Sequence, residues 1–89
     1  MGTQAKADIN RLLGQIIRKR RKQLCISQAE MADRLRLAGL DLSRQTIQKY
    51  ETGAVNITLS TICRMGSVLF GSEEQIVALL LAKLQERKD

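Results

Sequence analysis

Apolar residues recur at intervals of three and four along most of this chain, and no proline interrupts them. That spacing places apolar side chains on one face of an α-helix, and the abundant Leu, Ile, Ala, Gln, Lys and Arg residues favour helix overall. The chain has 89 residues, which suffices for one small domain with one core but leaves no room for a catalytic cleft between two domains. We therefore predict a single all-α domain without enzymatic activity.

Five helices follow from the apolar stripes and the capping residues. Ser27 with Glu30, and Ser72 with Gln75, match the capping-box pattern that starts a helix. The expected helices cover about 9–23, from Gln28 to the glycine at 39, 43–52, from Thr58 to about Gly71, and from the cap at Ser72 to about Arg87. Residues 1–8 are expected to form a flexible tail, and residues 9–89 the folded domain. The side chains expected inside are Leu12, Leu13, Ile16, Ile17, Leu24, Met31, Leu35, Leu37 or Ala38, Ile47, Tyr50, Leu59, Ile62, Met65, Val68 and Leu69.

The net charge of +6 is unevenly distributed. Residues 9–64 carry eleven Lys or Arg against four Asp or Glu, whereas residues 65–89 carry three against four. A basic surplus confined to one part of a small domain is typical of a nucleic-acid-binding surface, although an anionic membrane would also suit it. The apolar stripe of the basic helix is needed for the core, so we favour nucleic acid. Tyr50 and Phe70 are the only aromatic residues, which disfavours stacking on single strands.

Cys25 and Cys63 are the only cysteines, and histidine is absent. Two thiols cannot build a four-ligand zinc site, so we expect no metal, no cofactor and reduced packing cysteines. The longest apolar run, residues 76–82, is too short to cross a bilayer, and the chain lacks a secretory signal. These features predict a cytoplasmic protein.

The segment at residues 43–53, SRQTIQKYETG, begins and ends like a short helix. Ser43 is placed to cap the first free amides, and Gly53 stands just past the end. Only Ile47 and Tyr50 are apolar, so they should anchor the helix to the core. The remaining side chains are mostly hydrogen-bonding groups that the fold itself does not need.

Together with the helix before it, this segment forms a helix-turn-helix arrangement, whose second helix fits the major groove of B-DNA. Arginine pairs with guanine and glutamine with adenine when they project from the first turn of such a helix. Residues that hold phosphates position the protein without specifying sequence. The residues predicted to read bases are Arg44, Gln45 and Lys49, and those predicted to contact phosphates or to support the readers are Ser43, Thr46 and Gln48.

The segments ISQAEMADRL, SRQTIQKYETG and ITLSTICRM resemble the DNA-binding domain of the phage-repressor and Cro-like helix-turn-helix family. The resemblance covers roughly residues 12–71 by motif spacing. It implies a five-helix, lambda-repressor-like fold and a sequence-specific regulator of transcription that binds double-stranded DNA. Repression is the expected role, in the cytoplasm of a bacterial or phage-infected cell and in association with the nucleoid.

The resemblance also implies roles for single residues. Gln28, which opens the second helix, would touch a phosphate or support a base-reading residue. Thr52, directly before the closing glycine, would lie against the DNA backbone. Arg21 and Glu51 match a structural ion pair of the family, and losing one partner of a buried pair typically costs ~3–5 kcal/mol.

Three features depart from the family pattern. The spacing of 16 residues between Ser27 and Ser43 is about five longer than usual, so either the second helix gains a turn or the connection is a loop. Cys25 stands where a glycine commonly ends the first helix, which predicts a strained or altered turn. The loop after Gly53 reads AVNI and lacks a basic residue, so fewer phosphate contacts are expected.

The C-terminal helix is apolar over more than half of its circumference, which is wider than a small core requires. We expect this surface to contribute to a two-fold homodimer that binds an inverted-repeat operator, with the two reading helices ~34 Å apart. In the rival arrangement, a longer second helix covers the same surface within one subunit. The predicted interface residues are Ile76, Leu80, Leu81 and Leu84.

The alternative function is a protein-interaction module, such as the antitoxin of a toxin–antitoxin pair. Such a protein would need a segment that embraces a small protein partner. Only the tail at residues 1–8 or the C-terminal helix is free to do so.

Overall fold

The computed structural model describes the backbone of residues 2–86 and the side chains of residues 8–86. All regular structure in this range is helical. The helices are α1 (Gly2–Gln23), α2 (Gln28–Leu37), α3 (Arg44–Thr52), α4 (Leu59–Phe70) and α5 (Glu73–Glu86). The predicted all-α fold with five helices is therefore confirmed.

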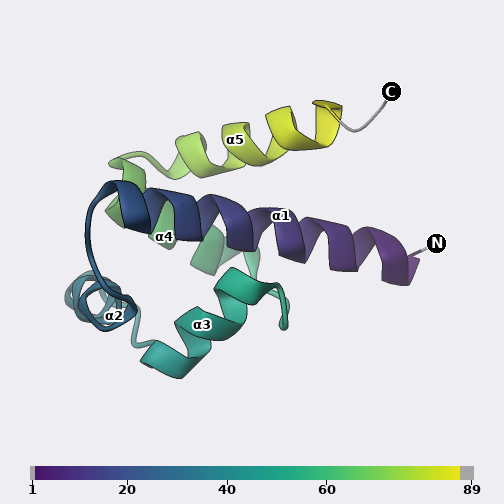
Figure 1. The fold of residues 1–89 in the computed structure, drawn as a ribbon. Helices are drawn as coiled ribbons and strands as arrows, with labels where there is room; N and C mark the ends of the chain where they lie inside the picture. Colours follow the sequence, from purple (N-terminus) through teal and green to yellow (C-terminus); the bar gives the residue numbers. More distant parts are fainter. Residues whose placement is uncertain (1, 87–89) are drawn as a thin grey trace.

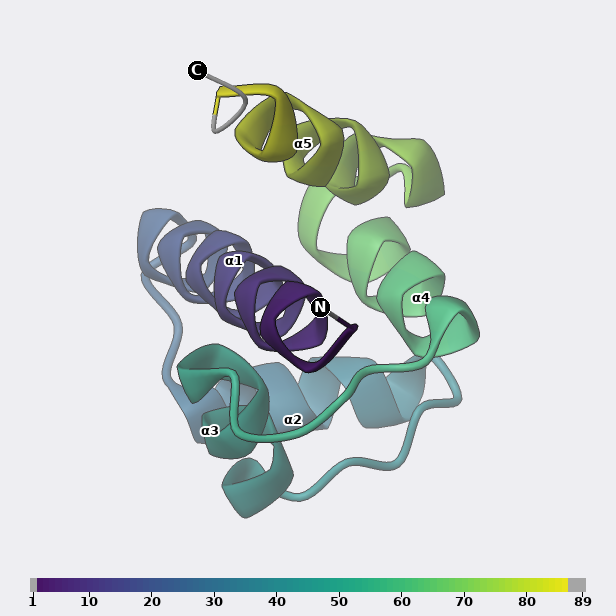
Figure 2. The ribbon, with the colours of Figure 1, turned by 90° about the vertical axis from the view of Figure 1, so that its right-hand side faces the viewer.

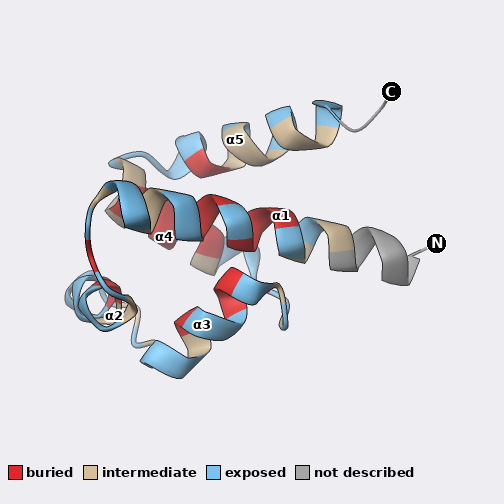
Figure 3. Ribbon diagram, viewed as in Figure 1, coloured by how far each residue is buried: buried red, intermediate tan, exposed pale blue. Residues whose placement is uncertain are grey.

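The long helix α1 lies at the centre of the molecule, with α5 on one side and α3 on the other (Figure 1). A view turned by 90° also shows α1 between α5 and α3 (Figure 2). α4 packs against both α1 and α5. Buried residues line the faces that the helices turn toward one another (Figure 3). Every helix contributes to the fully buried side chains Leu13, Ile17, Met31, Leu35, Ile47, Met65, Leu69 and Ile76.

Capping residues set the helix starts largely as predicted. Ser27 and Glu30 form the capping box at α2: Ser27 Oγ accepts the N–H of Glu30 at 3.0 Å, and the Glu30 carboxylate accepts the N–H of Ser27 at 3.3 Å. Thr58 caps α4. The box predicted at Ser72 and Gln75 does not form within the described part of the chain. Two glutamates in the first turn of α5 complement the helix dipole there.

α1, α2 and α3 end in the same hydrogen-bond pattern, the Schellman motif, which requires one residue with positive φ. Gly39 at φ 90° and Gly53 at φ 76° supply it after α2 and α3. After α1 the position is occupied by Cys25 at φ 59°. Left-handed backbone costs a residue with a Cβ about 1–2 kcal/mol. Of the strained or altered turn predicted at Cys25, the structure shows the strained one: the turn keeps the usual hydrogen bonds, and Cys25 takes the left-handed backbone.

The longer connection between α2 and α3 is a loop, residues 38–43, and not an extra helical turn. The loop is anchored at several points. Arg64 Nη1 donates to the Gly39 carbonyl at 3.2 Å, and the N–H of Leu40 donates to the Leu35 carbonyl at 2.8 Å. Leu40 and Leu42 pack against the core. The added residues thus form a well-packed loop that connects the two helices.

Some boundaries and inward positions need correction. α1 begins at Gly2, so residues 2–8, predicted as a flexible tail, are helical; the alanines and the lysine of this segment extend the helix as good helix formers. Leu37 is 86% exposed and Ala38 is exposed, because α2 ends there and only Met31 and Leu35 reach inside. Leu59 is 69% exposed, because α4 enters the core one turn later. Met1 and Arg87 lie outside the described residues.

Candidate nucleic-acid interface

The N-terminus of α3 is fixed by Ser43. Its Oγ accepts the N–H of Thr46 at 3.1 Å, and the two hydroxyl oxygens are 3.0 Å apart. Thr46 is also half-buried. Both hydroxyls are thus engaged in the cap, and these two residues are placed to support the helix; their contact with phosphates stays a prediction.

The outer face of α3 carries five exposed residues: Arg44, Gln45, Gln48, Lys49 and Thr52. The opposite face is buried, with Ile47 at 0%, Tyr50 at 9% and Glu51 at 7% exposure. At about 100° of rotation per residue, Gln48 lies between Arg44 and Lys49 on the outer face. From the sequence, Gln48 was predicted to flank the base-reading face and to contact phosphates. In the structure it lies on the same face as the predicted readers.

The long polar side chains of this outer face are not engaged by any other described residue. Among the described residues, Arg44, Gln45, Gln48 and Lys49 make no side-chain hydrogen bond or ion pair. Thr52 differs, because its hydroxyl donates to the Lys49 carbonyl at 3.1 Å. The face therefore presents guanidinium, amide and ammonium donors that the fold leaves available to a ligand.

A polar cluster behind α3 joins three helices. Arg21 of α1 donates to both carboxylate oxygens of Glu51, at 2.7 and 3.1 Å, and to the Ile26 carbonyl at 2.9 Å. Gln28 Nε2, at the start of α2, donates to the same carboxylate at 3.1 Å. The predicted ion pair between Arg21 and Glu51 is present and ties the end of α3 to α1, while the Gln28 hydrogen bond ties the same carboxylate to the start of α2.

The pKa of Arg21 is raised above its ordinary value, chiefly by the hydrogen bond to Glu51, while burial opposes the shift and the charge of Glu51 adds to it. A raised pKa means that folding favours the charged guanidinium, so this contribution to stability is fully present at neutral pH. That contribution is lost only as the pH rises through the folded-state pKa. The cluster therefore persists throughout the neutral range.

A shallow depression of about 410 Å³ separates the starts of α2 and α3. Arg21, Ser27, Gln28, Ala29 and Arg44 line it. Sequence reasoning selected Gln28 and Arg44 for this face but not Ser27 or Ala29, because only the packing of α2 on α3 brings those two beside Arg44. The free amides at the N-terminus of α2 make such a depression suited to an anion.

The C-terminal end of α3 is tied to α1. Asn10 Nδ2 donates to Asn56 Oδ1 at 2.6 Å, which holds the loop after α3. A Cβ on Gly53 would lie 2.9 Å from the Cα of Arg11, so the two backbones are in close contact. α3 is thus held against α1 at its C-terminal end, while its N-terminus is closed by its own cap.

The predicted dimer residues of α5 differ in exposure. Ile76 is 0% exposed and belongs to the core, so its prediction as an interface residue is wrong; α4 and α1 cover it. Leu80 and Leu84 are half-buried, and Leu80 packs against the core. Leu81 is 53% exposed. The packing of α5 on α4 and α1 accounts for part of its apolar width, and Leu81 is the main apolar side chain left outside.

No single helix in the described range is long and apolar enough to cross a membrane. The pair α4 and α5 reaches the required length and composition only together, and it is bent by 105°.

A family model described as Helix-turn-helix matches residues 17–76 of the chain. The matched region runs from the second half of α1 to the start of α5 and includes the polar cluster and the whole outer face of α3. No curated protein and no solved structure shows significant similarity to the chain.

Proposed function

The chain belongs to the Cro/C1-type helix-turn-helix family of DNA-binding transcription regulators, and from this we propose that it is a sequence-specific repressor that inserts α3 into the major groove of its operator. The observation that carries the proposal is the outer face of α3. Arg44, Gln45, Gln48 and Lys49 have no side-chain partner among the described residues, and the helix that carries them is capped at its start and held against α1 at its end. A regulator of this kind acts on the chromosome, so we place it in the cytoplasm with the nucleoid.

We assign base reading to Arg44, Gln45, Gln48 and Lys49. The guanidinium of Arg44 can donate two hydrogen bonds to guanine, and the amides of the glutamines can pair with adenine. Ser43 and Thr46 support the helix through its cap, and Gln28 through Glu51. Thr52 closes the face next to the DNA backbone. Removal of a supporting residue should weaken binding to all sequences alike.

The test begins with selection of preferred sites from a random duplex library, followed by fluorescence anisotropy. We expect a dissociation constant of ~10⁻⁸ to 10⁻¹¹ M on the selected site, at least ~10³-fold tighter than on random duplex, with affinity that falls steeply as salt rises. Equal weak binding to every duplex would refute sequence-specific recognition.

Arg44 offers a matched pair of variants. Arg44→Ala should cost ~1–3 kcal/mol on the preferred site and relax the preference at one base position. Arg44→Lys keeps the charge but loses the bidentate geometry, so it should also relax the preference while retaining more of the non-specific affinity. If both variants kept the base preference of the wild type, Arg44 would not be a base-reading residue.

We further propose a two-fold homodimer on an inverted-repeat operator, with the half-buried Leu80 and Leu84 and the exposed Leu81 at the interface. One module buries only ~600–1,000 Å² on DNA, so two half-sites add affinity and discrimination. Sedimentation should show that the wild type is a dimer and that Leu81→Lys is a monomer. The control Gln75→Lys changes another face of α5 and should stay dimeric. A monomeric wild type at ~10 μM, well above the concentrations at which specific sites fill, would refute the dimer.

A protein-interaction module is the second candidate, and the exposure of Leu37 and Leu59 favours it. Apolar side chains exposed in this way sometimes mark protein-binding surfaces, although isolated ones are common. Co-purification of a small protein encoded beside this chain, lost in Leu37→Ser, would support this function. Retention of the partner in that variant would exclude Leu37 from the contact.

A further inference from the structure

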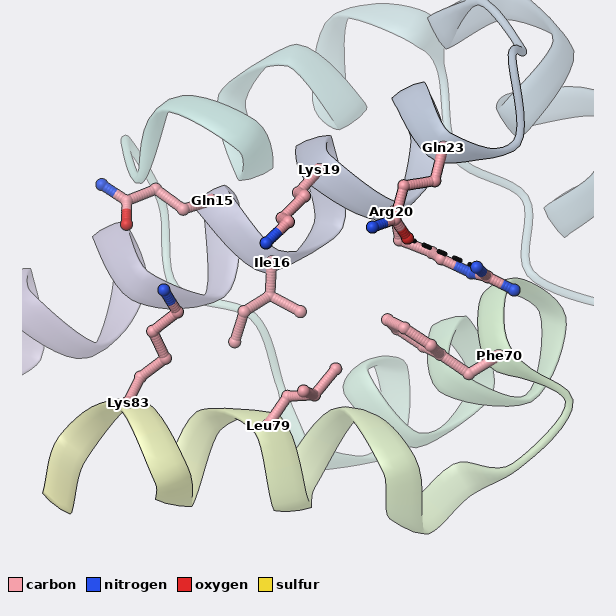
Figure 4. Close-up of a pocket in the computed structure, with 8 residues that line it drawn as sticks. All are labelled: Gln15, Ile16, Lys19, Arg20, Gln23, Phe70, Leu79 and Lys83. Atoms are coloured by element: carbon pink, nitrogen blue, oxygen red, sulfur yellow. Dashed lines mark hydrogen bonds between the residues drawn. The ribbon is translucent and has the colours of Figure 1, made fainter. Parts of the chain in front are cut away.

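A groove of about 390 Å³ lies between α1 and α5 (Figure 4). α5 packs on the side of α1 opposite α3 (Figure 1). Its floor is apolar: Ile16 of α1, Phe70 at the end of α4 and Leu79 of α5 surround the same space (Figure 4). The volume is within the range of about 300–1,000 Å³ that is usual for small-molecule sites. None of the proposed DNA-reading residues lines it.

The rim of the groove is positively charged. Lys19 and Arg20 of α1 and Lys83 of α5 line it, and no carboxylate among the described residues does. Lys19 and Lys83 make no hydrogen bond or ion pair among the described residues. The ammonium group of Lys83 rises from α5 toward α1 (Figure 4). The positive charge around the apolar floor is therefore not neutralised within the described part of the fold.

Arg20 is held in place at the edge of this groove. Its Nε donates to the Leu69 carbonyl at 2.7 Å and its Nη1 to Gln23 at 3.3 Å, while the guanidinium lies 5.1 Å from the centre of the Phe70 ring. A guanidinium has five N–H donors, so others stay available to an anion. Because the group is already ordered, a ligand that binds it loses less conformational entropy.

We propose that this groove binds a small amphipathic carboxylate, with the apolar body on the floor and the carboxylate among Lys19, Arg20 and Lys83. A purely inorganic anion would leave the apolar floor uncovered, and a neutral apolar molecule would leave the charges without partners. A second copy of the chain is disfavoured as the occupant. A two-fold interface brings the same patch of both subunits together, so the cations would face one another.

The test is an NMR titration of the ¹⁵N-labelled protein with decanoate, in the absence of DNA, with decanol as the neutral control. Decanoate should shift the amide signals of the groove residues in α1 and α5 in a saturable manner, and decanol should bind much more weakly. Because DNA is not involved, this result is independent of the proposed function.

Charge variants locate the site. Lys19→Gln/Lys83→Gln should weaken decanoate binding about tenfold, since each partly exposed ion pair contributes up to roughly a factor of five. Lys49→Gln removes the same type of charge from α3 and should leave the affinity unchanged. Both lysines lie at the surface, so the double variant should fold. An amide spectrum like that of the wild type would verify that it does.

Four outcomes would overturn the proposal. These are the absence of saturable shifts, equal binding of decanol, an equal loss of affinity in Lys49→Gln, and groove signals that respond to protein concentration instead of decanoate. The last would identify the groove as a contact between copies of the chain.

Discussion

The polar cluster of Arg21, Glu51 and Gln28 provides the most demanding test of how this fold holds α3 in place. Arg21→Met keeps most of the apolar stem but removes the two hydrogen bonds to Glu51 and the one to Ile26. The Glu51 side chain, 3% exposed, would then keep only the bond from Gln28. A carboxylate buried in this way cannot recover its hydration, so the folded state bears most of the cost.

The expected loss is about 3 kcal/mol, the lower end of the range of ~3–5 kcal/mol for breaking a buried pair, because the Arg21 side chain is 12% exposed and water can partly reach the site. A domain of this size has a total stability of roughly 4–13 kcal/mol. The variant should therefore lose a quarter or more of its stability, and its Tm should fall by about 12–24 °C.

Urea denaturation followed by circular dichroism at neutral pH measures the effect, with an unchanged m value as the check that the states compared are the same. The control is Arg36→Met, which breaks a pair with Asp33 whose side chains are 64% and 66% exposed, and it should cost less than about 1 kcal/mol. The double variant Arg21→Met/Glu51→Leu should regain most of the stability, because it leaves no unpaired charge. If Arg21→Met cost no more than Arg36→Met, or if the double variant were the least stable, the account of this cluster would be wrong.

Three further predictions concern single positions. Gly14→Ala should destabilise the protein by about 1–3 kcal/mol, because the added Cβ would lie 2.4 Å from the Tyr50 carbonyl oxygen, a backbone atom that cannot rotate away; the same melting assay on Gln15→Ala, an exposed neighbour, should show little change. Cys25→Gly should raise the stability by about 0.5–1 kcal/mol, since relief of about 1–2 kcal/mol of left-handed strain exceeds the entropy that glycine adds to the unfolded chain, and a lower Tm would contradict it. Gly53→Ala should lower the Tm and also weaken binding to all DNA sequences, because it strains the φ of 76° and pushes α3 away from α1; unchanged binding in anisotropy would show that the mounting of this end is unimportant.

The sequence pattern predicted the buried face of α3 but not that of α5. In α3 the cap at Ser43, the closing Gly53 and the two apolar residues fixed both the ends and the buried face, because each of these effects acts within a turn or two of helix. In α5 the apolar residues cover more than half of the circumference, so the pattern alone did not show which of them the core would cover. Ile76 was assigned to the wrong surface for that reason.

What the sequence determined by itself is local and periodic: the helical class, the capping box at Ser27, the special turn at Cys25 and the family to which the helix-turn-helix belongs. What only the tertiary structure decided depends on contacts between distant residues. The added residues before α3 form a loop because Leu40 and Leu42 find the core, and Gln28 donates to Glu51 because α2 packs across α3. The groove under Lys83 exists only because α5 folds back over α1. Side-chain periodicity repeats every few residues, whereas the geometry of a site depends on how whole helices cross, and that is set by the packing of the complete core.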